Sequence, residues 1–342
     1  MINFPFVSLF SFILVLGSVI SFSSSHWMGV WFGLELNLMG FVPLMIYSGK
    51  SHEVESGLKY FLIQALGSGM ILFGGLFLFH CLGNWEIIGD GVMMEHGVMM
   101  FGLLLKMGVA PFHFWLPSVM AGLSWMANMI LVTWQKVVPL FLLYSFFSFS
   151  MVELIFFCLF SSVIGGVGGM NQTSIRALLA YSSIVHLSWL LASSQINLVV
   201  CGVYFVVYFV ISIMIFFLLW SKEVGLGQQI GGVFMWDLSQ RQIFCLVMLS
   251  LGGVPPFLGF IGKWVVLVSL LSLGYYLLAF ILIFGSLLSF YYYLVLSFSM
   301  VMGFMSWKDM MIEKKSMLVV LVVFFNLFGG GVMFWLLSLM AY

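Results

Sequence analysis

The chain has 342 residues, of which 63% are hydrophobic and 18% aromatic, and it carries 11 basic and 11 acidic residues for a formal net charge of zero. So few charged groups exclude a soluble domain, because they cannot cover so much apolar surface. The neutral balance also argues against nucleic acid as a partner.

Apolar segments long enough to cross a hydrocarbon core of about 30 Å recur along the whole chain, which predicts an all-α polytopic membrane protein. The first segment, MINFPFVSLFSFILVLGSVI, lacks the basic opening of a signal peptide, so we interpret it as the first spanning helix. Ser/Gly/Asn clusters and short charged stretches separate the spans. The eleven predicted spans are 1–20, 26–47, 55–81, 97–120, 122–146, 149–167, 171–194, 196–220, 239–271, 273–299 and 316–340.

Basic residues are distributed unevenly about these spans. Eight of them fall on the side of the N-terminus, whereas the opposite side carries acidic residues but no Lys or Arg. This positive-inside bias predicts that the N-terminus faces the cytoplasm or the mitochondrial matrix and that the C-terminus faces the other side. The eight residues are Lys50, Lys59, Arg176, Lys222, Arg241, Lys308, Lys314 and Lys315.

Four ionisable residues lie deep within predicted spans: Glu35, Lys106, Lys136 and Lys263. Each such group costs about 2.5–3.5 kcal/mol at the bilayer centre, so the four together approach about 10–14 kcal/mol, comparable to the net stability of a whole domain. We therefore expect that they serve a function. The competing interpretation is that they reach an interface or form purely structural ion pairs.

Glu35 is the one acid at this depth, so we expect it to partner at least one of the lysines. A nearby carboxylate favours the charged ammonium and desolvation favours the neutral amine, so a lysine between these two effects can change protonation. His186 is also deep, and Ser182, Ser183 and Ser188 beside it are candidates for carrying a chain of water. Taken alone, a buried histidine is more often a packing group. Together these residues predict a path for protons.

The segments GVAPF and GVPPF place the same G-V-x-P-F pattern inside the fourth and the ninth span. They predict helix breaks at Gly108 and Pro111 in the first case and at Gly253, Pro255 and Pro256 in the second. Such breaks free backbone carbonyls that need protein or water as partners. Paired breaks in inverted halves are a pointer to the ion path of a transporter.

The position of the breaks also predicts the organisation of the chain. When the spans are divided into five, five and one, each break is fourth in a five-helix unit, and the odd number makes the two units cross the membrane in opposite senses. We therefore predict a first repeat at 1–146, an inverted second repeat at 149–299 and a C-terminal helix at 316–342.

Six stretches, in this order, resemble the subunit 2 family of mitochondrial NADH:ubiquinone oxidoreductase, respiratory complex I. They are WFGLELNL (31–38), ESGLKYFLIQ (55–64), KMGVAPFHFWLP (106–117), TWQK (133–136), RALLAYSSIVH (176–186) and LGGVPPFLGFIGK (251–263). That family is similar to the subunits of multi-subunit cation/proton antiporters, which have two inverted five-helix repeats with a broken helix in each. The last two predicted helices match only as apolar spans.

The resemblance implies a role for each matching residue. Glu35 resembles the glutamate that modulates the lysine of the first repeat, and Lys106 resembles that lysine. Lys136 resembles the lysine that links the half-channels, Lys263 the terminal lysine near the exit, and His186 a histidine of the same hydrophilic axis. The implied function is proton translocation across the mitochondrial inner membrane, coupled to quinone reduction elsewhere, with the N-terminus in the matrix and the C-terminus in the intermembrane space.

The resemblance implies no cofactor, metal or catalytic residue in this chain, because NADH, FMN, iron–sulfur clusters and ubiquinone are expected in other subunits. The four cysteines agree, since none has the C-x-x-C spacing of an iron–sulfur or zinc ligand pair. The implied partners are other membrane-arm subunits of complex I, including neighbouring antiporter-like subunits, and lipids such as cardiolipin.

Two alternatives stay open. One is a stand-alone cation/proton antiporter subunit, which the charge pattern permits equally. The other is a purely architectural membrane subunit in which the buried charges form structural pairs. An integral-membrane enzyme with its own active site has the least support, because the chain shows no nucleophile–base spacing and no phosphate-binding loop.

Overall fold

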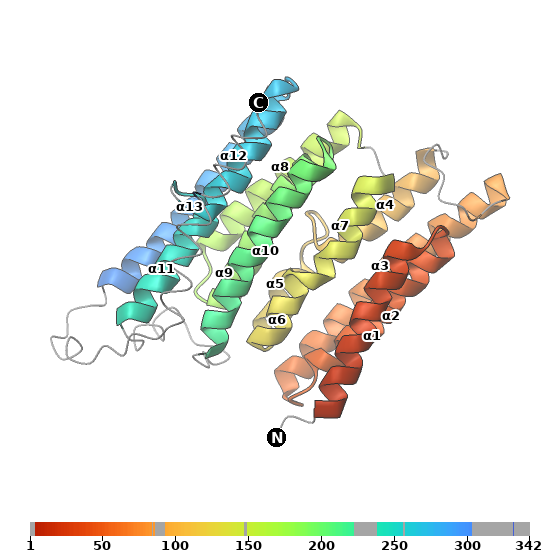
Figure 1. Ribbon diagram of the computed structural model, residues 1–342, viewed down its shortest axis with the longest axis horizontal. Coiled ribbons are helices and arrows are strands. Elements are labelled where there is room, and N and C mark those ends of the chain that lie inside the picture. Colours follow the sequence, from red (N-terminus) through yellow and green to blue (C-terminus); the bar gives the residue numbers. More distant parts are fainter. Residues whose placement is uncertain are drawn as a thin grey trace. The chain divides into compact units, whose positions relative to one another are not determined.

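The computed structural model describes residues 4–83, 85, 93–146, 149–221, 238–255, 257–302 and 331, and within them the regular elements are α-helices (Figure 1). Eight of these helices are long and apolar enough to cross a membrane. The predicted all-α polytopic fold is thereby confirmed. The chain divides into two compact units, Met1–Ser150 and Met151–Tyr342.

The described residues of the first unit form helices at its five predicted spans, of which the last two are interrupted. Its helices are α1 (Phe4–Ser23), α2 (Trp27–Met45), α3 (Ser51–Leu82), α4 (Met93–Met107), α5 (Trp115–Gly122), α6 (Trp125–Val132) and α7 (Trp134–Phe146). The pair α4 and α5 makes the fourth crossing and the pair α6 and α7 makes the fifth. The break in the fourth crossing is the one that the GVAPF segment predicts.

The described residues of the second unit also form helices at five predicted spans, and the fourth of these is broken as predicted. Its helices are α8 (Met151–Met170), α9 (Ile175–Ser194), α10 (Leu198–Ser221), α11 (Leu238–Gly252), α12 (Leu258–Ser272) and α13 (Tyr276–Met302). The pair α11 and α12 makes the broken crossing. The predicted C-terminal helix at 316–340 lies outside the described residues, apart from residue 331. The inverted relation of the two units stays a prediction.

In the first unit α1, α2 and α3 lie side by side (Figure 1), and α1 and α2 touch through their backbones. A Cβ atom added to Gly33 of α2 would lie 2.6 Å from the backbone nitrogen of Ser21 and 2.7 Å from the carbonyl oxygen of Gly17, both in α1. Small residues permit this approach, and in a bilayer such van der Waals packing replaces the hydrophobic effect between helices. The contact fixes α2, the helix that carries Glu35.

We expect Gly33→Ala to destabilise the first unit by about 1–3 kcal/mol, because the added methyl group overlaps two backbone atoms of α1. The measurement is the amount of folded chain in membranes and its melting temperature in detergent. Gly69→Ala is the matched control, since a Cβ atom there meets nothing within 4 Å. Equal stability of the two variants would contradict the backbone contact.

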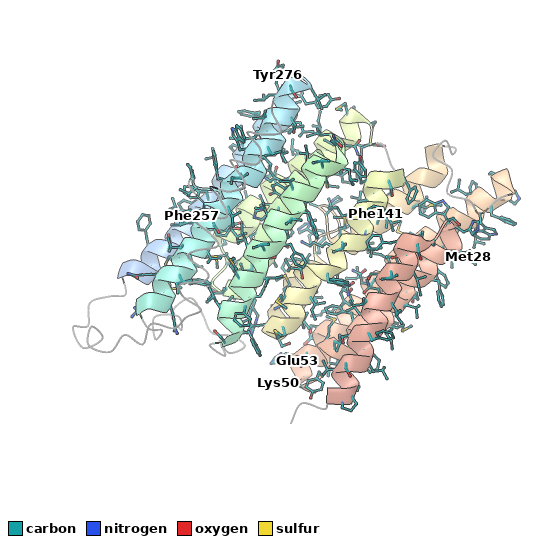
Figure 2. All side chains as sticks on the ribbon, in the orientation of Figure 1. Met28, Lys50, Glu53, Phe141, Phe257 and Tyr276 are labelled. Atoms are coloured by element: carbon teal, nitrogen blue, oxygen red, sulfur yellow. The ribbon has the colours of Figure 1, made fainter. Side chains whose placement is uncertain are left out.

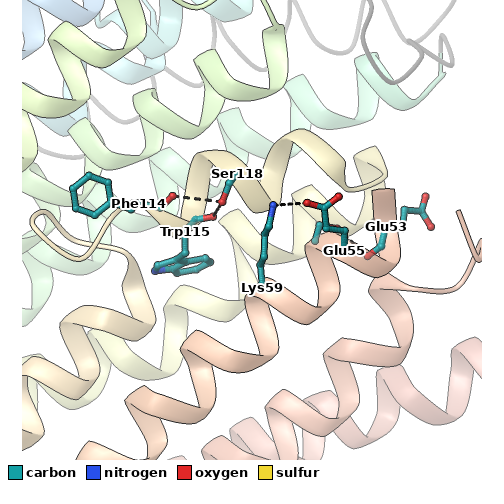
Figure 3. Close-up of polar contacts among 7 residues, drawn as sticks. Glu53, Glu55, Lys59, Phe114, Trp115 and Ser118 are labelled. Carbon is teal, nitrogen blue, oxygen red and sulfur yellow. Dashed lines mark hydrogen bonds and ion pairs between the residues drawn. The ribbon is translucent and has the colours of Figure 1, made fainter. Parts of the chain in front are cut away.

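One end of the first unit carries charged side chains. Lys50 precedes α3 and Glu53 lies in its first turn, near the N-terminal end of α1, whereas Met28 lies at the opposite end (Figure 2). About two turns further along α3, the Nζ atom of Lys59 lies 2.7 Å from Oε1 of Glu55, and both side chains are exposed (Figure 3). The two basic residues of this unit that are not enclosed by protein thus gather toward the end where the chain begins.

Candidate functional site

The three deep lysines are all enclosed by protein. The exposed fraction is 7% for Lys106, 2% for Lys136 and 7% for Lys263. Lysine is almost never buried to this degree unless it has partners or a function. What surrounds each ammonium group therefore decides what it can do.

In the first unit, a polar cavity of about 20 Å³ lies beside Lys106. A cavity needs roughly 10–15 Å³ to hold one water molecule, so this one has room for a single water. Helices α2, α3, α4 and α7 each contribute side chains to it. The lining residues are Leu34, Asn37, Leu38, Tyr60, Gln64, Lys106, Gln135 and Pro139.

The break after α4 lies two residues beyond Lys106. Gly108 has a φ of +79°, a left-handed conformation that glycine adopts without steric cost, and Pro111 follows a cis peptide bond in the connection. The indole Nε1 of Trp115 donates a hydrogen bond of 3.1 Å to the carbonyl oxygen of Leu105. The amide of Gln64 donates one of 3.2 Å to the carbonyl oxygen of Lys106. Neutral donors thus satisfy two of the last four carbonyl groups of α4.

The helix after this break begins at Trp115 and is anchored locally. The hydroxyl of Ser118 donates a hydrogen bond of 2.9 Å to the carbonyl oxygen of Trp115 (Figure 3). The indole of Trp115 therefore projects from a fixed first turn back onto α4. This geometry explains how the chain leaves helical geometry at Gly108 while a residue of the next helix caps the helix before it.

Glu35 lies on α2, one residue after the cavity-lining Leu34, and is half-buried. Its carboxylate interacts electrostatically with the ammonium group of Lys106. Among the described residues these two side chains form no direct ion pair, and Oε2 of Glu35 is buried without a hydrogen-bond donor. The expected partnership of Glu35 with a lysine stays a prediction.

Lys136 lies beside an interruption that the sequence does not predict. Thr133 separates α6 from α7, and its φ of −102° and ψ of −75° depart from a regular helix. Its hydroxyl donates a hydrogen bond of 2.6 Å to the carbonyl oxygen of Met129. Back-bonding of this kind bends helices. The predicted span 122–146 is thus an interrupted crossing, and Lys136 follows the interruption by less than one turn.

In the second unit, Lys263 reaches back from α12 to the end of α11. Its Nζ atom donates hydrogen bonds of 2.7 Å to the carbonyl oxygen of Gly252 and 3.2 Å to that of Leu251. Gly253, with a φ of +82°, ends α11, and Pro255 lies in the connection, whereas Pro256 falls outside the described residues. The C-terminal end of a helix carries partial negative charge, so an ammonium group is favourable there.

His186 lies on α9, whose residues are almost all buried. Its Nδ1 atom is 2.8 Å from the hydroxyl of Tyr204 on α10, and Trp189 stacks on the same tyrosine ring. A Cβ atom on Gly262, the residue before Lys263, would lie 3.3 Å from the ring of Tyr204. Tyr204 therefore contacts His186 and also lies beside Gly262, which directly precedes Lys263.

The serines around His186 are bonded within their own helix. The hydroxyls of Ser182, Ser183 and Ser188 donate to the carbonyl oxygens of the residues three positions earlier, at 2.7–2.8 Å. Their hydrogens are therefore used inside α9, and only their acceptor positions remain for other partners. A chain of water beside these hydroxyls stays a prediction.

A family model described as "NADH:quinone oxidoreductase/Mrp antiporter, TM" matches residues 24–289 of the chain. The chain belongs to this family. NADH-ubiquinone oxidoreductase chain 2 of Anopheles gambiae is 40% identical to it over 298 residues, 86% of each protein. The protein of the same name from Branchiostoma floridae is 34% identical over 346 residues, 96% of this chain and 98% of that protein. The resemblance that the sequence motifs indicated is confirmed.

Solved structures show the same NADH:quinone oxidoreductase/Mrp antiporter architecture. A chain of respiratory complex I from Thermus thermophilus with bound aureothin is 25% identical, with a TM-score of 0.78 over 86% of this chain and 70% of that one. A chain of the Mrp complex from Dietzia is 18% identical, with a TM-score of 0.77 over 89% of this chain and 60% of that one. The second likeness shows the fold alone.

Within this family fold, each unit brings some of the predicted residues together. The first unit places Glu35 near Lys106, and Gln135, which lines the cavity, directly precedes Lys136. The second unit brings the surroundings of His186 and Lys263 together at one tyrosine. The sequence analysis missed Asn37, Gln64, Gln135 and Tyr204. The first three stand in the quoted motifs, whereas the tyrosine stands in an apolar run without a signal.

Proposed function

We propose that the chain is a core membrane-arm subunit of NADH:ubiquinone oxidoreductase that translocates protons across the mitochondrial inner membrane, coupled to quinone reduction elsewhere in the complex. The path runs through Glu35, Lys106, Lys136, His186 and Lys263. The family and the chain 2 relatives support the assignment to this complex. In this proposal NADH, FMN, iron–sulfur clusters and ubiquinone belong to other subunits, and the N-terminus lies on the matrix side.

One observation carries this proposal: each of the three enclosed lysines lies beside or bonds to a helix interruption. An interruption frees backbone groups that can solvate an ammonium group or a water molecule in an otherwise apolar interior. A lysine in such a place can hold a proton and also release it. Arginine could not serve, because it does not deprotonate in proteins.

The chemistry required of these residues is proton exchange without covalent change. A proton leaves the Nζ atom of one lysine for an adjacent water or side-chain acceptor, and the lysine becomes neutral until it is reprotonated. A change in the field of the Glu35 carboxylate changes how strongly Lys106 holds its proton. Charge movement elsewhere in the complex can therefore be converted into proton movement at this pair.

Glu35→Gln and Lys106→Ala test the proposal. We expect each variant to lower proton pumping and coupled NADH turnover by at least about tenfold, which corresponds to about 1.4 kcal/mol in the barrier. The measurements are proton uptake by coupled vesicles and the amount of assembled complex on native gels. Lys59→Ala is the control, because its exposed ion pair contributes little. Normal pumping by an assembled double variant of Glu35 and Lys106 would sink the proposal.

A stand-alone cation/proton antiporter subunit is the second candidate, because the family description includes Mrp antiporters. Native gels decide between the two: migration with a large NADH-oxidising complex supports the first, and migration in a small assembly supports the second. A purely architectural role is the third candidate, and it predicts a different result. Such a scaffold would tolerate an apolar pair in place of Glu35 and Lys106.

A further inference from the structure

Three amide side chains converge on the cavity beside Lys106. Asn37 comes from α2, Gln64 from α3 and Gln135 from α7, and all three line the cavity. They stand in the stretches WFGLELNL, ESGLKYFLIQ and TWQK, which carry the resemblance to the family. None of them is ionisable, so the proton path of the preceding section does not use them.

Two hydrogen bonds link these amides to neighbouring helices around Lys106, and we call Asn37, Gln64 and Gln135 the frame. The amide nitrogen of Gln135 donates a hydrogen bond of 2.8 Å to Oδ1 of Asn37 and so joins α7 to α2. The amide nitrogen of Gln64 donates to the backbone carbonyl of Lys106 and so joins α3 to the last turn of α4. Asn37 and Gln64 are 3% and 5% exposed. These two side chains are therefore shielded from solvent and lipid, whereas Gln135 is half-buried.

The frame keeps hydrogen-bonding capacity after these two bonds are made. A primary amide has two donor hydrogens and an acceptor oxygen, so the oxygen atoms of Gln64 and Gln135 are acceptors in addition to the bonds that their nitrogens donate. A lysine ammonium group has three donors and no acceptor. Neutral oxygens on the cavity wall can orient the ammonium group, or a water bound to it, without adding a charge. A carboxylate in the same place would bind the ammonium group as a strong ion pair.

We propose that Asn37, Gln64 and Gln135 are positioning residues for Lys106 and that their neutrality is required. The inference rests on the proposed function, because it concerns how Lys106 exchanges its proton. The proton passes between the Nζ atom and a water oxygen in the cavity, and the amides neither gain nor lose a proton. They hold the donor and the acceptor in place.

Gln135→Glu is the deciding variant. The new carboxylate has the same shape and can still accept a hydrogen bond from Asn37 once the asparagine amide turns over, so a purely structural role predicts normal pumping. Our inference predicts at least about a tenfold loss of pumping per assembled complex, because a fixed negative charge beside Lys106 holds the ammonium form. Gln172→Glu, in the connection between α8 and α9, is the matched control and should pump normally.

A second set of variants tests the hydrogen bond itself. Gln135→Leu removes the bond to Asn37, and we expect lower pumping per complex together with a larger solvent deuterium isotope effect, since proton exchange becomes rate-limiting. The exchanged pair Asn37→Gln with Gln135→Asn restores an amide–amide bond and should recover pumping and the isotope effect. Should Gln135→Leu fail to assemble, the isosteric Gln135→Glu still decides.

The outcomes separate this inference from the proposed function. Normal pumping by assembled Gln135→Glu, while Lys106→Ala has lost pumping, overturns the positioning role and leaves the proton path intact. Normal pumping by Lys106→Ala overturns the proposed function and, with it, this inference. Loss of pumping in both, with the control unaffected, supports the two together.

Discussion

Replacing Gly259 by alanine should prevent the second unit from reaching its folded structure. A Cβ atom at Gly259 would overlap the carbonyl oxygen of Ser250 and would lie 2.8 Å from its carbonyl carbon. Both are backbone atoms of α11, so no side-chain rotation can relieve the overlap, and α12 would have to move away from the end of α11. We expect a loss of at least about 3 kcal/mol, the upper end of the usual cost of overpacking, and little assembled chain in membranes.

Gly202→Ala provides the comparison for this result. Gly202 lies on α10 of the same unit, and a Cβ atom there meets nothing within 4 Å. The same chemical change therefore carries no steric cost and gains up to about 1 kcal/mol of helix propensity. The measurement is the amount of each variant in native-gel assemblies. Accumulation of the Gly259→Ala variant to the level of the Gly202→Ala variant would contradict the close contact between α11 and α12.

Lys263→Arg should abolish proton pumping while the complex still assembles. The guanidinium group keeps donors for the carbonyl oxygens of Leu251 and Gly252, so the end of α11 stays capped. It does not release its proton, so a path that needs this step stops. Lys263→Ala removes the donors as well, and we expect a further loss of about 1–3 kcal/mol in stability from the carbonyls left without a partner.

The two Lys263 variants separate a proton carrier from a helix cap. Pumping is measured in coupled vesicles and normalised to the amount of assembled complex, with Lys59→Arg as the exposed control. If the arginine variant pumps like the control, Lys263 serves only as a cap, and the architectural interpretation gains support. If the arginine variant assembles without pumping and the alanine variant assembles poorly, Lys263 has both roles.

The helix breaks were the part of the fold that the sequence predicted best. The G-V-x-P-F pattern combines a residue suited to positive φ with a proline that cannot continue a helix, and the structure ends α4 and α11 at these places. The interruption at Thr133 could not be predicted in this way. Threonine fits inside a helix, and whether its hydroxyl bonds back to the preceding turn depends on the surrounding tertiary structure.

The candidate site shows the same division between strong and weak signals. Charged residues in apolar spans are conspicuous because burial is expensive, so Glu35 and the three lysines stand out in the sequence. Burial of a neutral amide costs less free energy than burial of a charge, so amides in a span attract less notice. Whether Asn37, Gln64 and Gln135 converge depends on how α2, α3 and α7 are rotated about their axes. Tyr204 is concealed further, since aromatic residues are common in spans and its contact with His186 joins two helices.

The C-terminal ends of α4 and α11 both expose backbone carbonyl groups that need hydrogen-bond donors, and two different kinds of donor supply them. An indole and an amide, neither of which titrates, close the first end; a primary amine, which does, closes the second. Departure of a proton leaves the first closure as it was, whereas in the second it removes the attraction between a cation and the negative pole of the helix. The hydrogen bonds that cap α4 thus do not depend on protonation, whereas the cap of α11 weakens when Lys263 loses its proton.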